Sequence, residues 1–304
     1  MTDIYVNRGG SRRHRIVAGI AGLALVLGAG WVLSRSGAPE SEEKESAPDG
    51  ETVREAPPGN QPPPTAAAPE NLLSVEELEA LVASNRLHEA RKQAFVRLES
   101  LPEGSARLGT ELFLGDLHTR MVFEKIPMEE KITHVVGRGD TLGKLARTYG
   151  TTPELIALSN GIERNMIRLG ETLRILQGSF SAVVHKTRND MVVTLNGRFF
   201  KRYPVGTGTH SSTPEGDYVI TLRLRHPVWY RPDGEQFPYG HPENLLGTHY
   251  LKLNTPGIGL HGTWEPETVG SQSSAGCVRL KNEMIEELYN LLPEGTSVRI
   301  ENGS

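Results

Sequence analysis

One cysteine and one histidine in the C-terminal third of the chain have the types and the spacing that nucleophilic catalysis needs. Cys277 is the single cysteine among 304 residues, and His261 lies sixteen positions before it. A thiol is a weak nucleophile until it loses its proton, and a neighbouring imidazole is the usual group to accept that proton. Gly262 follows the histidine and Gly276 precedes the cysteine, which would let backbone approach a substrate closely. We therefore expect a cysteine nucleophile with a histidine base.

Both residues belong to a longer pattern, in which His-Gly is followed after a spacer by Ser-x-Gly-Cys-Val-Arg-Leu. This pattern resembles the catalytic signature of the YkuD-type L,D-transpeptidases, cysteine enzymes that cross-link bacterial peptidoglycan. Segments at 205–220, 244–253 and 294–300 resemble the same family. The resemblance implies a mostly-β catalytic domain at 179–302. One position departs from it, because the family usually has a histidine where this chain has Ala275.

The resemblance also implies roles for individual residues. The sulfur of Cys277 would be ionised beside His261, in a groove open to a peptide, and the Gly262 carbonyl would orient the imidazole. Ser274 and Gly276, together with the N–H of Cys277, would shape an oxyanion site. The implied reaction is attack on the carbonyl of diaminopimelate, the third residue of the stem peptide. It releases D-Ala and forms a 3→3 cross-link with a second stem.

Several expectations around this site have two alternatives. Arg279 would hold a carboxylate of the stem peptide or form a structural ion pair. Trp229, Tyr230 and Trp264 would be walls of the substrate groove or parts of the core. The protein as a whole could instead be a hydrolase of the same family, an L,D-carboxypeptidase or amidase in which water is the acceptor. It could also be a non-catalytic protein that binds the cell wall, a reading suggested by Ala275.

A second module is predicted at 132–177. A short strand leads into a helix that Asp140 or Thr141 would cap and that Gly150 would end, and a second helix would begin near Pro153. A returning strand would close the module at residues 173–176. This β-α-α-β order, with the motif VVxxGDTLxxLA, resembles the LysM domain, which binds glycans that contain N-acetylglucosamine. The resemblance places the sugar between two loops, in contact with Gly139, Asp140, Thr141, Leu142, Asn160, Gly161 and Ile162.

The N-terminal region has the pattern of a membrane anchor. Residues 16–33 carry no charge, and as a helix they would span about 27 Å, close to the thickness of a bilayer core. Arginines precede this segment and acidic residues follow it, so the positive-inside rule predicts a cytoplasmic tail at 1–15. We expect a single-pass protein of the cytoplasmic (inner) membrane, with the catalytic domain in the periplasm or cell-wall space. A cleaved secretory signal is the alternative.

Two further segments join the anchor to the LysM-like module. Residues 34–70 are rich in Pro, Glu, Ala and Ser and are expected to be a disordered linker. Residues 71–131 show helical spacing, beginning with a capping box at Ser74 and Glu77. We expect helices near 87–101 and 105–124, either as a spacer or packing element or as a module that binds a partner.

The composition argues against several kinds of partner and site. The net charge of −4 offers no basic face for nucleic acid, and one cysteine cannot form an internal disulfide. No pair of His, Cys or acidic residues has the spacing of a metal site, so neither metal nor cofactor is expected. The expected partners are peptidoglycan and the membrane. The expected fold is multidomain: a transmembrane helix, a small α-helical segment, a LysM module and a mostly-β catalytic domain with a helix at 283–291 capped by Asn282.

Overall fold

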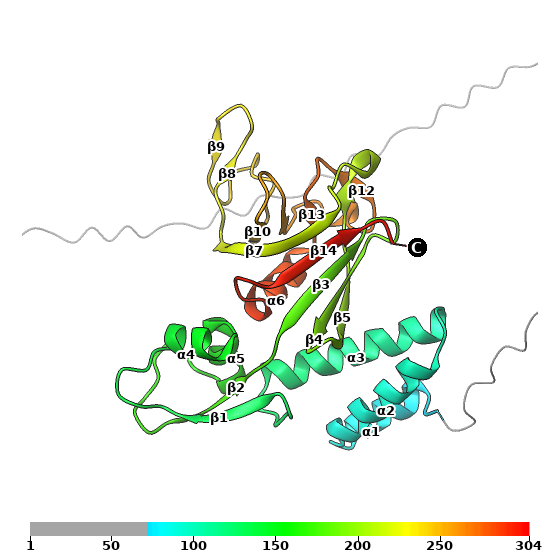
Figure 1. Ribbon diagram of the computed structural model, residues 1–304, viewed down its shortest axis with the longest axis vertical. Coiled ribbons are helices and arrows are strands. Elements are labelled where there is room, and N and C mark those ends of the chain that lie inside the picture. Colours follow the sequence, from blue (N-terminus) through cyan, green and yellow to red (C-terminus); the bar gives the residue numbers. More distant parts are fainter. Residues whose placement is uncertain (1–71, 304) are drawn as a thin grey trace, which may run out of the picture. The chain divides into compact units, whose positions relative to one another are not determined.

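The computed structural model describes residues 72–303, and the expected cytoplasmic tail, membrane anchor and linker at 1–70 lie outside them. Within the described part, no helix combines the length and the apolar character that a bilayer crossing requires. Along the chain come three helices, a small module of two strands and two helices, and a larger sheet domain (Figure 1). The order of the helical, LysM-like and sheet-rich parts is the one predicted.

The first part is a set of three helices, α1 (Val75–Ala83), α2 (Leu87–Ser100) and α3 (Ser105–Phe123). Ser74 and Glu77 form the predicted capping box at the start of α1, with hydrogen bonds of 2.7 and 3.2 Å. The helices share a small apolar cluster of their own. The long helix α3 also packs along strand β5 (Arg198–Pro204) of the sheet domain (Figure 1). These helices therefore pack on the sheet domain, which agrees with the expected alternative of a spacer or packing element.

A buried histidine lies at the contact between α3 and β5. The Nδ1 of His118 donates to the carbonyl of Phe200 at 2.8 Å, and its Nε2 accepts from the Nε of Arg91 at 3.0 Å. The imidazole also stacks on the Phe200 ring, with centroids 5.2 Å apart. Because the guanidinium can only donate, the contacts hold His118 as the neutral tautomer. Burial lowers the pKa of His118 to about 4.

We expect this histidine to make the fold sensitive to acid. An unfolded histidine has a pKa of about 6.5, so below that pH the unfolded chain takes up a proton that the native state refuses. The contribution of His118 is complete above pH 6.5 and falls as the pH approaches 4, by up to about 3 kcal/mol. Urea unfolding at several pH values should show wild type losing stability faster than His118→Gln across this window. Parallel curves for the two proteins would contradict it.

The second part is the predicted β-α-α-β module. Its elements are β1 (Lys131–Val135), α4 (Leu142–Tyr149), α5 (Pro153–Asn160) and β2 (Thr172–Leu176), and the two strands pair antiparallel. Of the two caps considered for α4, the structure selects Thr141, whose hydroxyl accepts from the N–H of Lys144 at 3.2 Å. Gly150 and Gly161 end the two helices at φ of 68° and 65°, in the left-handed region that favours glycine.

The third part is built on an eight-stranded mixed sheet with the order β13-β11-β10-β7-β14-β3-β4-β5. Only the β11–β13 and β14–β3 neighbours are parallel. The Asn196-Gly197 turn joins β4 to β5 as predicted, with both residues at positive φ. Besides β5, the strands of this sheet are β3 (Phe180–His185), β4 (Asp190–Leu195), β7 (Gly216–Arg225), β10 (His249–Leu253), β11 (Gly259–His261), β13 (Val278–Arg279) and β14 (Ser297–Glu301).

Helix α6 (Asn282–Leu291) packs against β10 and β11 through fully buried side chains such as Ile285 and Leu288. The prediction that Asn282 caps this helix is wrong. The cap position is Lys281, which makes no side-chain cap bond, and Asn282 is already helical. The Asn282 side chain instead accepts from the N–H of Thr248 at 3.1 Å, because the loop before β10 lies against the start of the helix.

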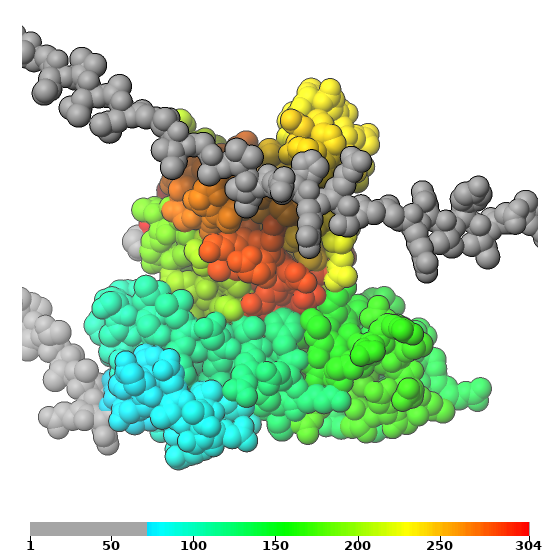
Figure 2. Space-filling model, turned by 180° about the vertical axis from the view of Figure 1, so that it is seen from behind, coloured from blue at the N-terminus to red at the C-terminus, as the bar shows by residue number. Residues whose placement is uncertain are grey.

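Four shorter strands complete the domain. The strands β6 (Thr207–Gly208) and β12 (Gln272–Ser274) pair in parallel, and β8 (Trp229–Tyr230) pairs antiparallel with β9 (Gln236–Phe237). The β8–β9 ribbon, yellow in Figure 2, projects from the rest of the domain. It brings aromatic side chains to the edge of the sheet face on which the predicted nucleophile lies.

Candidate active site

The sheet places the predicted nucleophile and base on one face. Strands β11 and β13 are parallel neighbours, with Leu260 opposite Val278 and His261 opposite Arg279. Leu260 and Val278 are fully buried in the core. Since side chains alternate along a strand, His261 and Cys277 lie on the opposite face. Strand spacing and rise put their Cα atoms about 8 Å apart, a separation that two facing side chains can bridge.

The imidazole of His261 is held from behind by the backbone. Its Nδ1 lies 2.6 Å from the carbonyl oxygen of Gly262, the contact that the sequence analysis expected. A carbonyl can only accept, so the proton is on Nδ1 and Nε2 is left as the basic nitrogen. Burial lowers the pKa of His261 to about 4, and the charge of Arg279 acts in the same direction, against the Gly262 hydrogen bond. The imidazole is neutral at pH 7.

The position of Gly262 is fixed by close neighbours. Its N–H donates to the carbonyl of His249 at 3.1 Å. A Cβ at Gly262 would lie 2.2 Å from the Oδ1 of Asn282, and a Cβ at Gly247 would lie 2.4 Å from the Gly262 carbonyl carbon. Gly247 also has a φ of 63°. Both positions therefore need glycine. The side chain of Asn282, at the start of α6, packs closely against the Gly262 backbone.

We expect Gly262→Ala to misplace the imidazole. The new methyl group would collide with Asn282, and the carbonyl that orients His261 would have to move. A displacement of about 1 Å at a catalytic group typically costs about 10²-fold in rate. Adding Asn282→Ala removes the colliding oxygen and should restore part of the loss. Acyl-transfer rates of both variants test this, with Gly109→Ala as control because a Cβ there meets nothing closer than 3.9 Å. An unchanged rate in Gly262→Ala would contradict it.

The hydrogen-bond geometry and the burial of Cys277 both favour a protonated thiol. Its Sγ donates to the carbonyl of Gly257 at 3.1 Å. Burial raises the pKa of the Cys277 thiol, and this effect exceeds the opposing influence of the Gly259 N–H and of Arg279. The sequence led us to expect a resting thiolate, whereas these shifts favour a neutral thiol, because desolvation disfavours the charged sulfur and the imidazole has too low a pKa to be its partner cation.

Ser274 shapes the turn that carries the cysteine. Its hydroxyl donates to the carbonyl of Cys277 at 2.7 Å and accepts from the N–H of Gly276 at 3.1 Å. The Gly276 N–H is thus engaged within the turn. Gly276 has a φ of 142°. Ala275, which replaces the family's histidine, is exposed on this turn.

A pocket of about 350 Å³ has Cys277 in its wall. Trp229 and Tyr230 of the β8–β9 ribbon line it, which favours the groove-wall alternative for these two residues. Burial and the neighbouring Cys277 raise the pKa of Tyr250, another lining residue, to about 12. Tyr250 and Lys252 were not among the predicted site residues, although their alternation with buried leucines in β10 is a usable signal. The full lining is Leu222, Leu224, Val228, Trp229, Tyr230, Leu246, Tyr250, Lys252, Gly257 and Cys277.

Arg279 lies beside this pocket but does not line it. Its Nη1 forms an ion pair with Glu265 at 3.3 Å, and its side chain is 12% exposed. It borders a separate small cavity of about 60 Å³, together with Leu245 and Trp264. The structural ion pair, one of the two predicted alternatives, is therefore present.

The LysM-like module carries a larger groove of about 770 Å³. Four of the predicted contact residues line it: Asp140, Thr141, Gly161 and Ile162. Gly139, Leu142 and Asn160 do not line it. Leu142 is buried in the module's core, and the amide of buried Asn160 bonds both backbone groups of Arg174, at 2.8 and 2.9 Å. Gly139 lies in the preceding loop at a φ of 83°. The opposite wall, residues 163–168 with Glu171, was not anticipated.

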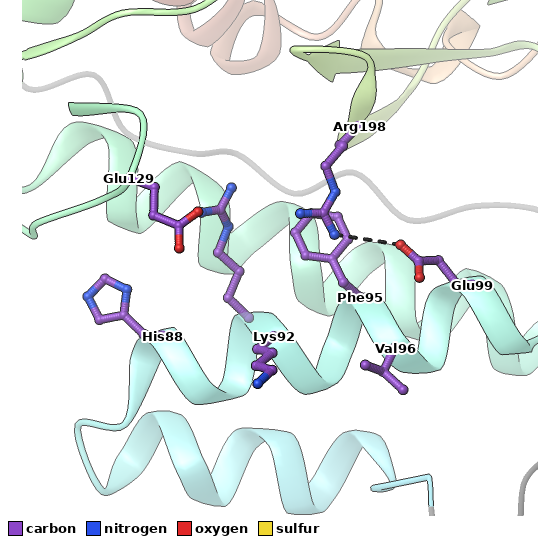
Figure 3. A pocket seen from close by; sticks show the side chains of 8 residues that line it. His88, Lys92, Phe95, Val96, Glu99, Glu129 and Arg198 are labelled. Atoms are coloured by element: carbon purple, nitrogen blue, oxygen red, sulfur yellow. Dashed lines mark ion pairs between the residues drawn. The ribbon is translucent and has the colours of Figure 1, made fainter. Parts of the chain in front are cut away.

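A pocket of about 470 Å³ on α2 contains neither the cysteine nor any residue of the LysM groove (Figure 3). The guanidinium of Arg198 lies over the Phe95 ring at 3.8 Å and pairs with Glu99 at 3.6 Å (Figure 3). Arg91, Lys92 and Glu129 also line it, and the charge of Arg91 is already paired with Glu130 at 2.5 Å. The pocket presents no nucleophile and no predominant charge. Among residues 72–303, no group of three or more His, Cys, Asp or Glu side chains could hold a metal ion.

Comparison with known proteins agrees with this division of the chain. Residues 179–300 match the YkuD family, described as the L,D-transpeptidase catalytic domain, and residues 134–176 match the LysM domain. A Bacillus subtilis protein named "Putative L,D-transpeptidase YqjB" is 33% identical over 131 residues, which are 41% of this chain and 73% of that protein. "Putative L,D-transpeptidase YkuD" of the same organism is 28% identical over 176 residues, 56% of this chain and 98% of the relative. A solved L,D-transpeptidase from Mycobacterium smegmatis aligns with a TM-score of 0.36 and 19% identity, over 43% of this chain and 63% of that one.

Proposed function

Because this chain belongs to the L,D-transpeptidase family, we propose that it cross-links peptidoglycan through an acyl-enzyme on Cys277. The observation that carries the proposal is the arrangement on β11 and β13. A thiol in the wall of a pocket and a neutral imidazole share one face of the sheet, and the Gly262 carbonyl holds the imidazole proton on Nδ1. This arrangement supplies a nucleophile and a free basic nitrogen.

In the proposed reaction the sulfur attacks the carbonyl of the third residue of a donor stem while Nε2 of His261 takes the thiol proton. The Cys277 N–H would stabilise the oxyanion. Collapse of the tetrahedral intermediate expels D-Ala, whose amine takes the proton from His261, and leaves a thioester. The side-chain amine of a second stem then attacks the thioester, loses a proton to His261, and releases the cross-linked product with the free thiol.

We further propose that the LysM module holds the enzyme on glycan, with Asp140, Thr141, Gly161 and Ile162 in the groove wall. The anchor at 16–33 would tether it as a single-pass protein of the cytoplasmic membrane. The catalytic domain would then face the periplasm or cell-wall space. The uncharged N-terminal stretch and the LysM match support this arrangement.

The departure at Ala275 does not by itself argue against catalysis. Ala275 is exposed, and the hydrogen bonds of Cys277 and His261 do not involve it. Loss of that histidine leaves the nucleophile, the base and the orienting carbonyl in place.

The deciding experiment incubates the full chain in detergent micelles with a disaccharide tetrapeptide and analyses the products by mass spectrometry. A cross-linked dimer with free D-Ala is the expected result. D-Ala with uncross-linked tripeptide would identify an L,D-carboxypeptidase instead. Neither product, with retained binding to sacculi, would overturn the enzymatic proposal and leave a wall-binding protein.

A further inference from the structure

The pocket beside Cys277 is apolar and aromatic apart from one cation. Among the described residues that line it, Lys252 is the one with a charged side chain. Its ammonium group has no hydrogen-bond or ion-pair partner among residues 72–303. A charge kept without a partner at the edge of an apolar pocket is available to a ligand of opposite sign.

The register of the sheet aligns this lysine with the nucleophile. Lys252 on β10 is opposite Gly259 on β11, and the β11–β13 register continues to bring Gly259 opposite Cys277. The three residues thus form one row across three strands, with the Cα atoms of Lys252 and Cys277 about 10 Å apart. The middle member is glycine, and the space that its side chain would fill is taken by the ring of Tyr250, which lines the pocket between the lysine and the thiol. A Cβ at Gly259 would lie 2.6 Å from the Tyr250 ring.

Charge complementarity indicates the group that Lys252 binds. In the proposed reaction, the carbonyl that the sulfur attacks belongs to diaminopimelate. The side chain of this residue carries a carboxylate about one side-chain length from that carbonyl. The other cation near the site, Arg279, is already paired with Glu265 and borders the separate small cavity. The unpaired ammonium in the cysteine pocket is therefore a better match for this carboxylate than the guanidinium is.

Resting on the function proposed above, we infer that Lys252 is a specificity-determining residue that binds the side-chain carboxylate of the donor stem. The enzyme would then distinguish a stem with a free carboxylate from one in which that carboxylate is amidated. It would do so through one charge-assisted hydrogen bond at the solvent-exposed edge of the pocket.

The test compares two tetrapeptide stems that differ only in this group, carboxylate or carboxamide. We expect wild type to show a kcat/KM for D-Ala release about tenfold higher with the carboxylate, as befits one charge-assisted hydrogen bond. Lys252→Gln should lose the preference, Lys252→Glu should reverse it, and Lys252→Arg should keep most of it. Lys92→Gln is the matched control, since Lys92 is an exposed lysine on α2 outside this pocket, and it should keep the full preference. Equal ratios in wild type and Lys252→Gln would overturn the inference.

A second readout separates this inference from the proposed function. Each stem peptide can protect Cys277 from alkylation by iodoacetamide, and protection reports binding even if no turnover occurs. We expect the carboxylate peptide to protect wild type at about tenfold lower concentration than the amide, and this difference to vanish in Lys252→Gln. Product formation without a difference in protection would overturn the lysine role alone. A difference in protection without any product would overturn the enzymatic function and retain the carboxylate site.

Discussion

Replacing Cys277 with alanine is expected to abolish both D-Ala release and cross-linking, a loss of at least about 10⁴-fold. The reaction then has no atom that can form the thioester, and no other cysteine exists in the 304 residues. Binding to sacculi should persist, because the LysM groove is formed by residues 140–171 and does not include the thiol. Product analysis by mass spectrometry and co-sedimentation with sacculi measure the two properties separately.

The conservative variant Cys277→Ser tests whether a hydroxyl can replace the thiol as nucleophile. It keeps a hydroxyl in the same pocket, but a hydroxyl is far harder to deprotonate than a thiol, and a base with a pKa of about 4 gives little help. We expect Cys277→Ser to be as inactive as Cys277→Ala, with the wild-type acyl-enzyme mass absent from both. Residual cross-linking in Cys277→Ala would require another nucleophile and would contradict the assignment.

Features that depend on local sequence were predictable. Thr141 caps a helix, and Gly150 and Gly161 end two, because each acts on backbone groups within four or five residues of itself. The placement of Cys277 and His261 on one face of the sheet was predictable for a different reason. Their motif fixes two neighbouring strands, and alternation then places both side chains on the face opposite the core.

Features that depend on tertiary contacts were not predictable in the same way. Lys252 and Tyr250 reach the pocket through strand pairing, which brings β10 beside β11. Asn282 looked like a helix cap, but its side chain bonds Thr248, 34 positions away. Asn160 looked like a loop residue beside a sugar, but its amide satisfies the backbone of Arg174. In each case the polar group has a partner that only the folded chain supplies.

The α-helical segment also makes tertiary contacts that its sequence alone does not predict. Charged residues on a predicted helix are ordinarily assigned to a solvated face, yet Glu111 of α3 is 3% exposed and pairs with Arg202 of β5 at 2.7 Å. Buried His118 also bonds Phe200 of β5. A charge that finds its partner in another element can lie inside the molecule, and this is why the packing role of α3 required the structure.

The protonation state of the Cys277 thiol should control how fast this residue is alkylated. We expect the rate of Cys277 alkylation by iodoacetamide to rise about tenfold per pH unit from pH 6 to pH 9, about 10³-fold in total. Only the thiolate reacts, and burial raises the thiol pKa above its ordinary value of about 8.5. His261, with a pKa of about 4, is neutral throughout this range and provides no imidazolium to stabilise the anion. Since the chain has one cysteine, the measured rate belongs to Cys277 alone.

His261→Gln separates the two possible resting states. If the pair is neutral, this variant should keep the rising alkylation profile, because the solvent removes the proton in both proteins. Its acyl-transfer rate should nevertheless fall by about 10²–10⁴-fold, since the base acts while the sulfur attacks the substrate. A resting thiolate–imidazolium pair would instead give wild type a flat alkylation rate between pH 5 and pH 8, which His261→Gln would convert into a rising one. That outcome would contradict the neutral pair, and it would mean that the site stabilises the ionised sulfur more than burial opposes it.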